Sequence, residues 1–323
     1  DFLFSMIAAG DRERTEAVDP PVSDVIARGV ATLQDAPPDD PELLAEMATL
    51  LGHMDTSIGK HQRAGELLDM ALASAQRTSD PALLANVRIR QGILANAEGE
   101  AQRAIEYFET ALGDVARVGP ARREPLLAAA LGGWAYAMSN VGRGEEAYAR
   151  LATTLATPGM IPRAEWRAEL LLAQTIVTAD PSARLEILDA VQQLYTGIEP
   201  KPIDRLALAS MRSQTLSQVG KPVEAVQFAQ EAAALADRVH PGNSIRRARI
   251  YNNLGSLLAT ANRMGDAVAA FGVAEAIYRA QGDEDSPAFA ALVHNRGVQL
   301  RDLGAAELGL PMIEQAHAMA SAQ

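Results

Sequence analysis

Residues 248–283 read ARIYNNLGSLLATANRMGDAVAAFGVAEAIYRAQGD. Small and apolar residues recur three and four positions apart on both sides of a break at residues 261–266, which is typical of two amphipathic helices. These positions are Tyr251, Leu254, Gly255, Leu258, Ala267, Phe271 and Ala274. Two such helices joined by a turn form a helical hairpin, and neither can bury its apolar face alone. The stretch therefore predicts a hairpin with further copies of itself on either side.

The rest of the chain contains those copies. A Gly, Asn or Asp ends each first helix at intervals of 38 to 43 residues, at Gly59, Gly99, Gly142, Asp180, Gly220, Asn262 and Gly304. These residue types tolerate the left-handed conformation in which many helices end. Seven positions earlier stands a small residue in every copy, namely Gly52, Gly92, Ala135, Ala173, Ser213, Gly255 and Gly297. This regularity predicts a close crossing of the two helices in each hairpin.

The repeats predict an all-α fold, a right-handed superhelical solenoid of antiparallel helix hairpins. We expect about seven hairpins in one continuous domain over residues 41–323, and N-terminal helices or a half repeat over residues 1–40 as a cap. Helices are expected at residues 1–9 and 22–34. Asp40-Pro41 and Asp80-Pro81 each place a capping residue before a proline in a first helical turn. The copy at about residues 161–195 fits least well, because Asp189 stands at an otherwise apolar or small position.

Composition limits the classes of partner. The 323 residues are 48% hydrophobic and carry a net charge of −12, which argues against nucleic acid and anionic membrane surfaces as partners. The absence of cysteine excludes disulfides and thiolate metal sites. No segment is apolar enough to cross a membrane, so we expect no direct membrane insertion. The chain begins with Asp1, and we expect it to be an excised or processed fragment.

Signatures of catalysis and of cofactor binding are missing from the sequence. It contains no Gly-rich phosphate loop, no His-Arg-Asp catalytic loop, no HExxH and no GxSxG. None of the five histidines stands at metal-binding spacing from another. We therefore expect a protein that is not an enzyme and that needs no cofactor or metal.

The pattern Tyr251, Leu254-Gly255, Leu258, Ala267, Phe271, Ala274 resembles the tetratricopeptide repeat (TPR) family. The repeats here are longer than the family's usual period of about 34 residues by roughly six to eight residues. In this respect they resemble the repeats of kinesin light chains. The resemblance implies a non-catalytic interaction module that binds a peptide or protein segment in the concave groove formed by the first helices.

A narrower resemblance concerns the first seventy residues. Phe2-Leu3-Phe4, residues 22–30, Pro41 to Glu46 and Leu51-Gly52 resemble the entry to the TPR region of certain bacterial serine/threonine protein kinases, although Val22-Ser23-Asp24 departs from the usual start. TPR-bearing transcription regulators share much of this pattern. The alternative function is therefore a regulatory or sensory tail of a bacterial signalling protein, acting through ligand binding or oligomerisation. We expect a cytoplasmic protein or, as the alternative, the periplasmic part of a membrane-anchored one.

Candidate binding residues follow from the family's groove positions, counted from the small residue of each copy, and from the asparagine position of kinesin-light-chain-like repeats. They are Asn96, Tyr136, Gln214, Arg249, Asn252, Asn253, Ser256, His294, Asn295 and Arg301. The resemblance to kinesin light chains implies that Asn253 and Asn295 clamp the backbone of an extended peptide. A carboxamide offers both a donor and an acceptor, so it can pair with a peptide group of any sequence. The alternative is that such asparagines bond between repeats or face solvent.

The last hairpin, over residues 300–322, keeps apolar residues without a separate polar helix to cover them. They are Leu310, Met312, Ile313 and Met319. An uncovered terminal repeat invites association, so we expect a homodimer through the C-terminal repeat as one arrangement.

Overall fold

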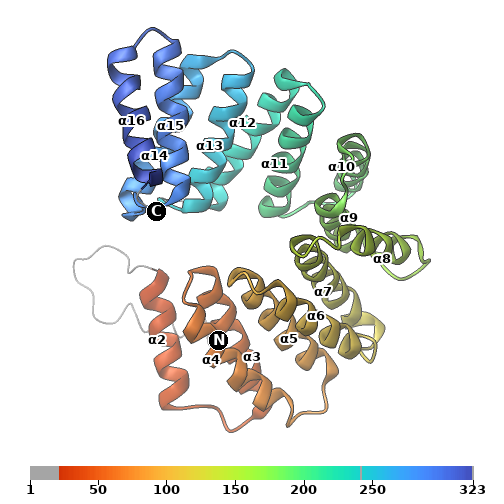
Figure 1. Ribbon diagram of the computed structural model, residues 1–323. Coiled ribbons are helices and arrows are strands. Elements are labelled where there is room, and N and C mark those ends of the chain that lie inside the picture. Colours follow the sequence, from red (N-terminus) through yellow and green to blue (C-terminus); the bar gives the residue numbers. More distant parts are fainter. Residues whose placement is uncertain (1–21, 241, 322–323) are drawn as a thin grey trace. The chain divides into compact units, whose positions relative to one another are not determined.

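The computed structural model describes residues 22–240 and 242–321, and every regular element in these ranges is a helix (Figure 1). The all-α fold of repeated helix hairpins is confirmed. The helix predicted at residues 22–34 is α2, whereas the one predicted at residues 1–9 lies outside the described residues. The helices are α2 (Val22–Asp35), α3 (Pro41–Ser57), α4 (His61–Ala75), α5 (Pro81–Ala97), α6 (Ala101–Val115), α7 (Pro120–Asn140), α8 (Gly144–Ala156), α9 (Ala164–Val177), α10 (Pro181–Thr196), α11 (Pro202–Gln218), α12 (Pro222–Val239), α13 (Ile245–Thr260), α14 (Met264–Gln281), α15 (Pro287–Asp302) and α16 (Ala306–Ser321).

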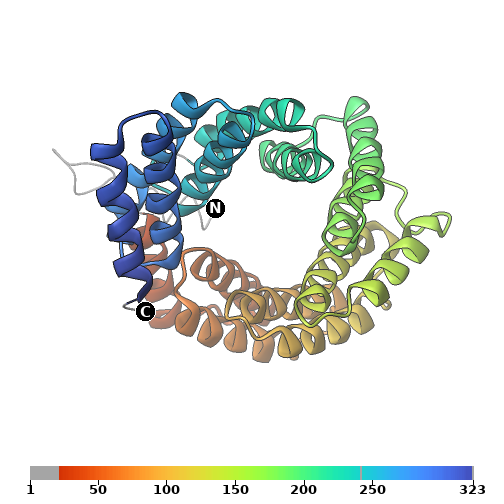
Figure 2. The same cartoon turned by 45° about the horizontal axis from the view of Figure 1, so that its top comes forward.

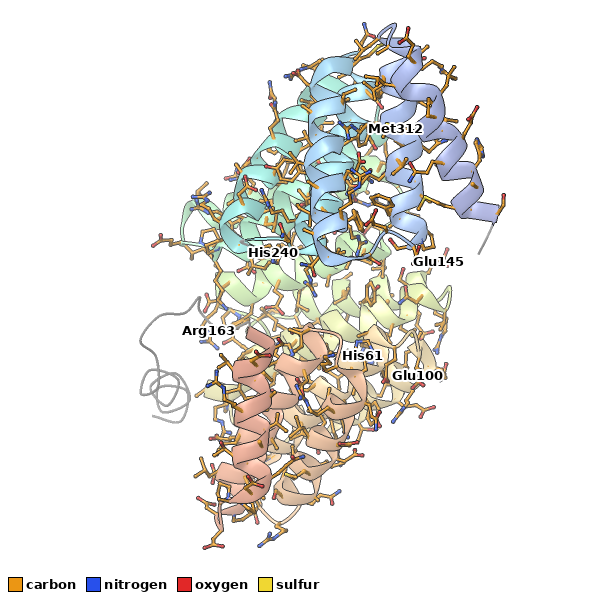
Figure 3. All side chains as sticks on the ribbon, turned by 90° about the vertical axis from the view of Figure 1, so that its left-hand side faces the viewer. His61, Glu100, Glu145, Arg163, His240 and Met312 are labelled. Atoms are coloured by element: carbon orange, nitrogen blue, oxygen red, sulfur yellow. The ribbon has the colours of Figure 1, made fainter. Side chains whose placement is uncertain are left out.

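The chain divides into two compact units, Asp1–Val177 and Thr178–Gln323. In the first unit, Phe108 and Trp134 are fully buried within the largest core cluster. In the second unit, Phe271 and Phe289 take the same role, and Met312 of α16, labelled in Figure 3, packs against that core. Each unit thus has a hydrophobic core made of its own residues.

The first unit stacks the hairpins α3/α4, α5/α6 and α7/α8, followed by α9. The first helices α3, α5, α7 and α9 touch one another in sequence, whereas α4, α6 and α8 pack mainly against first helices (Figure 2). His61 and Glu100, labelled in Figure 3, mark the turns of two consecutive hairpins. Because the first helices of successive hairpins pack on one another, whereas α4, α6 and α8 do not, the first helices form the inner side of this stack. We call the surface of α3, α5, α7 and α9 on this side the first inner face.

The second unit stacks α11/α12, α13/α14 and α15/α16, with α10 packed against α11. Successive hairpins join through contacts of α12 with α13 and of α14 with α15, and α13 also touches α15. We call the corresponding surface of α11, α13 and α15 the second inner face.

The repeated small residues lie where the two helices of a hairpin cross. A Cβ atom added to Gly52, Gly92 or Gly255 would lie 2.9, 2.7 or 2.6 Å from the side chain of Leu68, Phe108 or Phe271. At Gly297 it would lie 2.8 Å from the carbonyl oxygen of Gly309. Real Cβ atoms do not approach other atoms this closely, so a larger residue would force the helices apart. The predicted close crossings are confirmed at these four glycines.

The turn residues adopt the predicted left-handed conformation with one exception. Positive φ angles occur at Gly59, Gly99, Gly142, Gly220, Asn262 and Gly304. The prediction for Asp180 is wrong, because its φ is −73° and its side chain accepts hydrogen bonds from the backbone N–H groups of Ser182 and Ala183. Asp180 therefore begins α10 as an N-cap, with Pro181 as the first helical residue.

The hairpin predicted at about residues 161–195 is divided between the two units. Its first helix, α9, packs on α7 and α8, and its second, α10, packs on α11. The copy that fits the repeat pattern least well in the sequence is thus the one that does not form a hairpin within one unit. By contrast, the predicted caps are confirmed, since Asp40 and Asp80 accept hydrogen bonds from the backbone N–H groups of Glu42 and Ala82.

Candidate partner-binding surface

Two of the predicted binding residues meet on the second inner face. Gln214 of α11 and Asn253 of α13 are exposed and line one small cleft of about 10 Å³, together with Ser210 and Leu254. Gln214 lies one position after the small residue Ser213, and Asn253 lies two positions before Gly255. The register of the repeats thus brings these two positions of neighbouring first helices together. Ser256 and Asn295 stand in the same register on α13 and α15.

Asn252, the residue before Asn253 in α13, has a side-chain oxygen without a hydrogen-bond partner among the described residues. Its side chain is partly buried, and its Oδ1 atom is buried without a hydrogen-bond partner in the described part of the chain. A buried acceptor without a partner costs about 1–3 kcal/mol. Its backbone carbonyl, in turn, accepts a 3.1 Å hydrogen bond from the Ser256 hydroxyl.

Arg249 adds positive charge to α13. It is exposed and forms no ion pair or side-chain hydrogen bond with the described residues. Arg249 lies near Tyr278. Burial raises the pKa of the Tyr278 phenol, and the positive charge of Arg249 opposes that rise. On the neighbouring turn of the helix, Arg247 is already paired with Asp237 at 2.6 Å. Arg249 is therefore available to an acidic partner.

The remaining predicted residues are more dispersed. Asn96 of α5 donates a 3.3 Å hydrogen bond to the Gly133 carbonyl oxygen of α7, as the bonding-between-repeats alternative describes. The His294 ring packs edge-on against His317 of α16, with 5.5 Å between the centroids. Arg301 donates to the neighbouring Asp302. Tyr136 is 44% exposed on α7. These contacts do not assemble the four residues into one site.

The first inner face carries a pair of residues that the sequence analysis did not combine. Burial, together with nearby Arg90 of α5, lowers the pKa of His53 of α3 to about 4, so the imidazole is neutral at pH 7. Burial also lowers the pKa of Arg90, which has no acidic partner in the described ranges. The Nδ1 atom of His53 is buried and unpartnered there as well. The repeat register predicts this pair, because His53 and Arg90 occupy the same two register positions as Gln214 and Asn253.

Neither a metal centre nor a membrane span is evident in the described ranges. Residues 22–240 and 242–321 hold no group of three or more His, Asp or Glu side chains placed to bind a metal ion. No helix in these ranges is long and apolar enough to cross a membrane.

Residues 204–280 match the family model of the tetratricopeptide repeat. This segment is similar to tetratricopeptide repeats. It runs from the first turn of α11 to the end of α14, and it contains Gln214, Arg249, Asn252, Asn253 and Ser256. No curated protein sequence matches the chain.

Solved structures show the same fold at low sequence identity. One is a chain of the APC/C hetero-tetramer Cut9–Hcn1, with a TM-score of 0.61 and 14% identity over 93% of this chain and 50% of that chain. This protein therefore spans half of that relative. A TPR protein from Parabacteroides merdae gives a TM-score of 0.50 and 15% identity over 85% and 90% of the two chains. A Rap protein complexed with Competence and Sporulation Factor gives a TM-score of 0.51 and 11% identity over 99% of this chain and 95% of that chain.

Proposed function

We propose that this protein is a non-catalytic interaction module that binds an extended peptide or protein segment on the second inner face. The observation that carries the proposal is the group of amides at α11 and α13. Gln214 and Asn253 are exposed and share a cleft. These amides lie on first helices of the TPR region.

Binding would rest on pairing with the partner's backbone. Side-chain amides can donate to a peptide carbonyl and accept from a peptide N–H, so a row of them holds a strand regardless of its side chains. Rigid helices hold the amides in place before binding, which lowers the entropy that binding costs. Arg249 would favour segments with an acidic side chain. On the first inner face, Arg90 has no acidic partner among the described residues and would also favour segments with an acidic side chain.

Proteins of the same fold support a role in partner binding. The Cut9 chain belongs to a hetero-tetramer with Hcn1, and the Rap protein was crystallised with Competence and Sporulation Factor. Because the sequence identity of these proteins to this chain is low, the comparison supports a shared fold but does not carry their partners over to this chain. We propose only the general role of holding another protein or peptide.

The regulatory-tail role is the second candidate. It rests on the resemblance of the first seventy residues to bacterial kinase tails and on the end of the last hairpin, where Leu308 and Leu310 are 64% and 49% exposed. Association of two copies through α16 would cover these side chains. The kinase origin, the homodimer and the compartment stay predictions.

The amide proposal is tested by selection and substitution. Peptides are first selected from a random display library on the intact chain, and their affinity is then measured by isothermal titration calorimetry. Replacing Gln214 and Asn253 by Ala removes two hydrogen bonds of about 0.5–1.5 kcal/mol each. The double variant should therefore bind roughly 5- to 150-fold more weakly, with an unchanged helical circular dichroism spectrum.

The matched control is the double variant Gln227→Ala and Gln230→Ala, which removes exposed amides from the second helix α12. It should bind like the original chain. Equal affinity of the inner-face variant and the original chain for every selected peptide, or a library without binders, would contradict the proposal.

A further inference from the structure

A separate cavity lies in the second unit, where α10, α11 and α12 meet. Its volume is about 250 Å³. Each helix contributes a pair of residues that stand one turn apart and so lie on one helical face. These pairs are Gln192 and Tyr195 of α10, Arg205 and Leu208 of α11, and Phe228 and Glu231 of α12, and Ala209 of α11 and Pro200 complete the lining. We call this cavity the α10–α12 pocket.

Two opposite charges line the pocket without neutralising each other. Arg205 and Glu231 are exposed, and neither side chain forms an ion pair or hydrogen bond with another described residue. Elsewhere in this unit, arginines such as Arg247 and Arg296 are paired with carboxylates. The α10–α12 pocket therefore offers one free cation and one free anion to the same small volume.

The apolar part of the pocket is held in place by its surroundings. Leu208 is buried in α11. The guanidinium of Arg212, which pairs with Asp189 of α10, lies 5.0 Å from the centre of the Phe228 ring. This stacking is a favourable cation–π contact and fixes the ring. The pocket thus combines a rigid apolar wall with two unpaired charges.

From this arrangement we propose that the α10–α12 pocket binds a free apolar amino acid. The carboxylate would pair with Arg205, whose planar guanidinium matches a carboxylate with two parallel hydrogen bonds. The ammonium would face Glu231, and the side chain would pack on Leu208 and Phe228. The volume lies just below the range of about 300–1,000 Å³ typical of drug-sized ligands, which suits a smaller molecule.

A wider cavity of about 510 Å³ adjoins the pocket through Pro200 and Arg205 and gives a large apolar side chain room to extend. Because the ligand would touch three helices at once, it would hold α10 against the α11/α12 hairpin. Binding should therefore raise the melting temperature of the protein, and the rise should continue to grow with the logarithm of ligand concentration above the Kd. The chain would then sense the supply of an amino acid independently of its inner faces.

The test uses the intact chain with leucine, methionine and phenylalanine, followed by thermal unfolding and calorimetry. Leucinol lacks the carboxylate and N-acetyl-leucine lacks the ammonium, so each should bind at least tenfold more weakly than leucine. Arg205→Met and Glu231→Gln should each weaken leucine binding at least tenfold. Both side chains are exposed and unpaired, so these variants should keep their helical spectrum.

Control variants carry the same changes away from the pocket. Arg246→Met on α13 and Glu314→Gln on α16, both at exposed positions, should bind leucine normally. The Gln214→Ala, Asn253→Ala variant should also bind leucine normally, which separates this inference from the proposed peptide site. Absence of binding at millimolar concentrations of all three amino acids would overturn the inference. So would equal binding of leucine and its two analogues, or binding that Arg205→Met and Glu231→Gln leave unchanged.

Discussion

Phe271 fits into its hairpin because the residue opposite it has no side chain. Its ring atoms lie 2.6 Å from the place where a Cβ atom on Gly255 would stand. Gly92 and Gly133 both accommodate the ring of Phe108 in the same way. A fully buried aromatic ring contributes much of a hairpin's core, so the missing Cβ atom allows close packing of the two helices.

Gly255→Ala should therefore destabilise the protein. The added methyl group must displace the Phe271 ring, and overpacking of this kind costs about 1–3 kcal/mol. Urea unfolding followed by circular dichroism measures the change. The control is Gly113→Ala on α6, where nothing lies within 4 Å of an added Cβ atom and the lost backbone freedom should stabilise by about 0.5–1 kcal/mol. A Gly255→Ala protein as stable as the original would mean that the ring has room to move.

At the scale of elements, a buried carboxylate joins two hairpins. Glu275 of α14 is nearly fully buried and is held by Arg279 of its own helix at 2.6 Å and by Arg296 of α15. The two arginines remain 51% and 29% exposed, so they keep part of their hydration while the carboxylate does not. The contact with Arg296 is the one that links successive repeats.

Arg296→Met should loosen this link. The methionine keeps the apolar stem but leaves Glu275 buried with one cation in place of two, at a cost of about 1–3 kcal/mol. Adding Glu275→Gln to the Arg296→Met variant should recover part of the lost stability, because the buried charge is then removed. Arg301→Met, which breaks an exposed pair with Asp302, should change stability by less than about 0.5 kcal/mol. Chemical denaturation of the four proteins gives these differences, and no recovery in the double variant would argue against a charge effect.

Elements fixed by local rules were predictable from the sequence. A left-handed glycine, an Asp-Pro cap and a small residue at a helix crossing each act within one hairpin, so Gly99, Asp80 and Gly92 were correctly assigned. Asp180 was assigned wrongly, because aspartate suits both a helix end and a helix start. The proline that follows it was the deciding signal, as at Asp40 and Asp80.

Of the two candidate sites, one follows from the repeat pattern and the other does not. The meeting of Gln214 with Asn253 follows from the repeat register and was predictable once the copies were aligned. The α10–α12 pocket was not, because Arg205 and Glu231 come together only through the packing of α10 on α11, where the repeat pattern breaks. Irregular packing of this kind leaves no periodic trace in a sequence.

At the scale of the whole molecule, the repeats form two units whose cores use separate residues. Hairpins in a repeat protein are stabilised chiefly by their nearest neighbours, so a stack that keeps its neighbours should fold without the rest of the chain. Residues 178–323 contain α10 to α16 and the core around Phe271 and Phe289. We expect this fragment to be helical and to unfold cooperatively when it is expressed alone.

Circular dichroism and guanidinium unfolding of this fragment test the expectation, with a shorter fragment as the control. A chain that begins at Pro222 keeps α12 but loses α11, whose buried Leu216 belongs to the same core cluster as Val226 and Ala229 of α12. The uncovered face of α12 should lower the midpoint and broaden the transition, because the end of the stack then exposes apolar surface to water. If residues 178–323 bind a hydrophobic dye and melt without a transition, while the intact chain melts sharply, the second unit depends on the first for its stability.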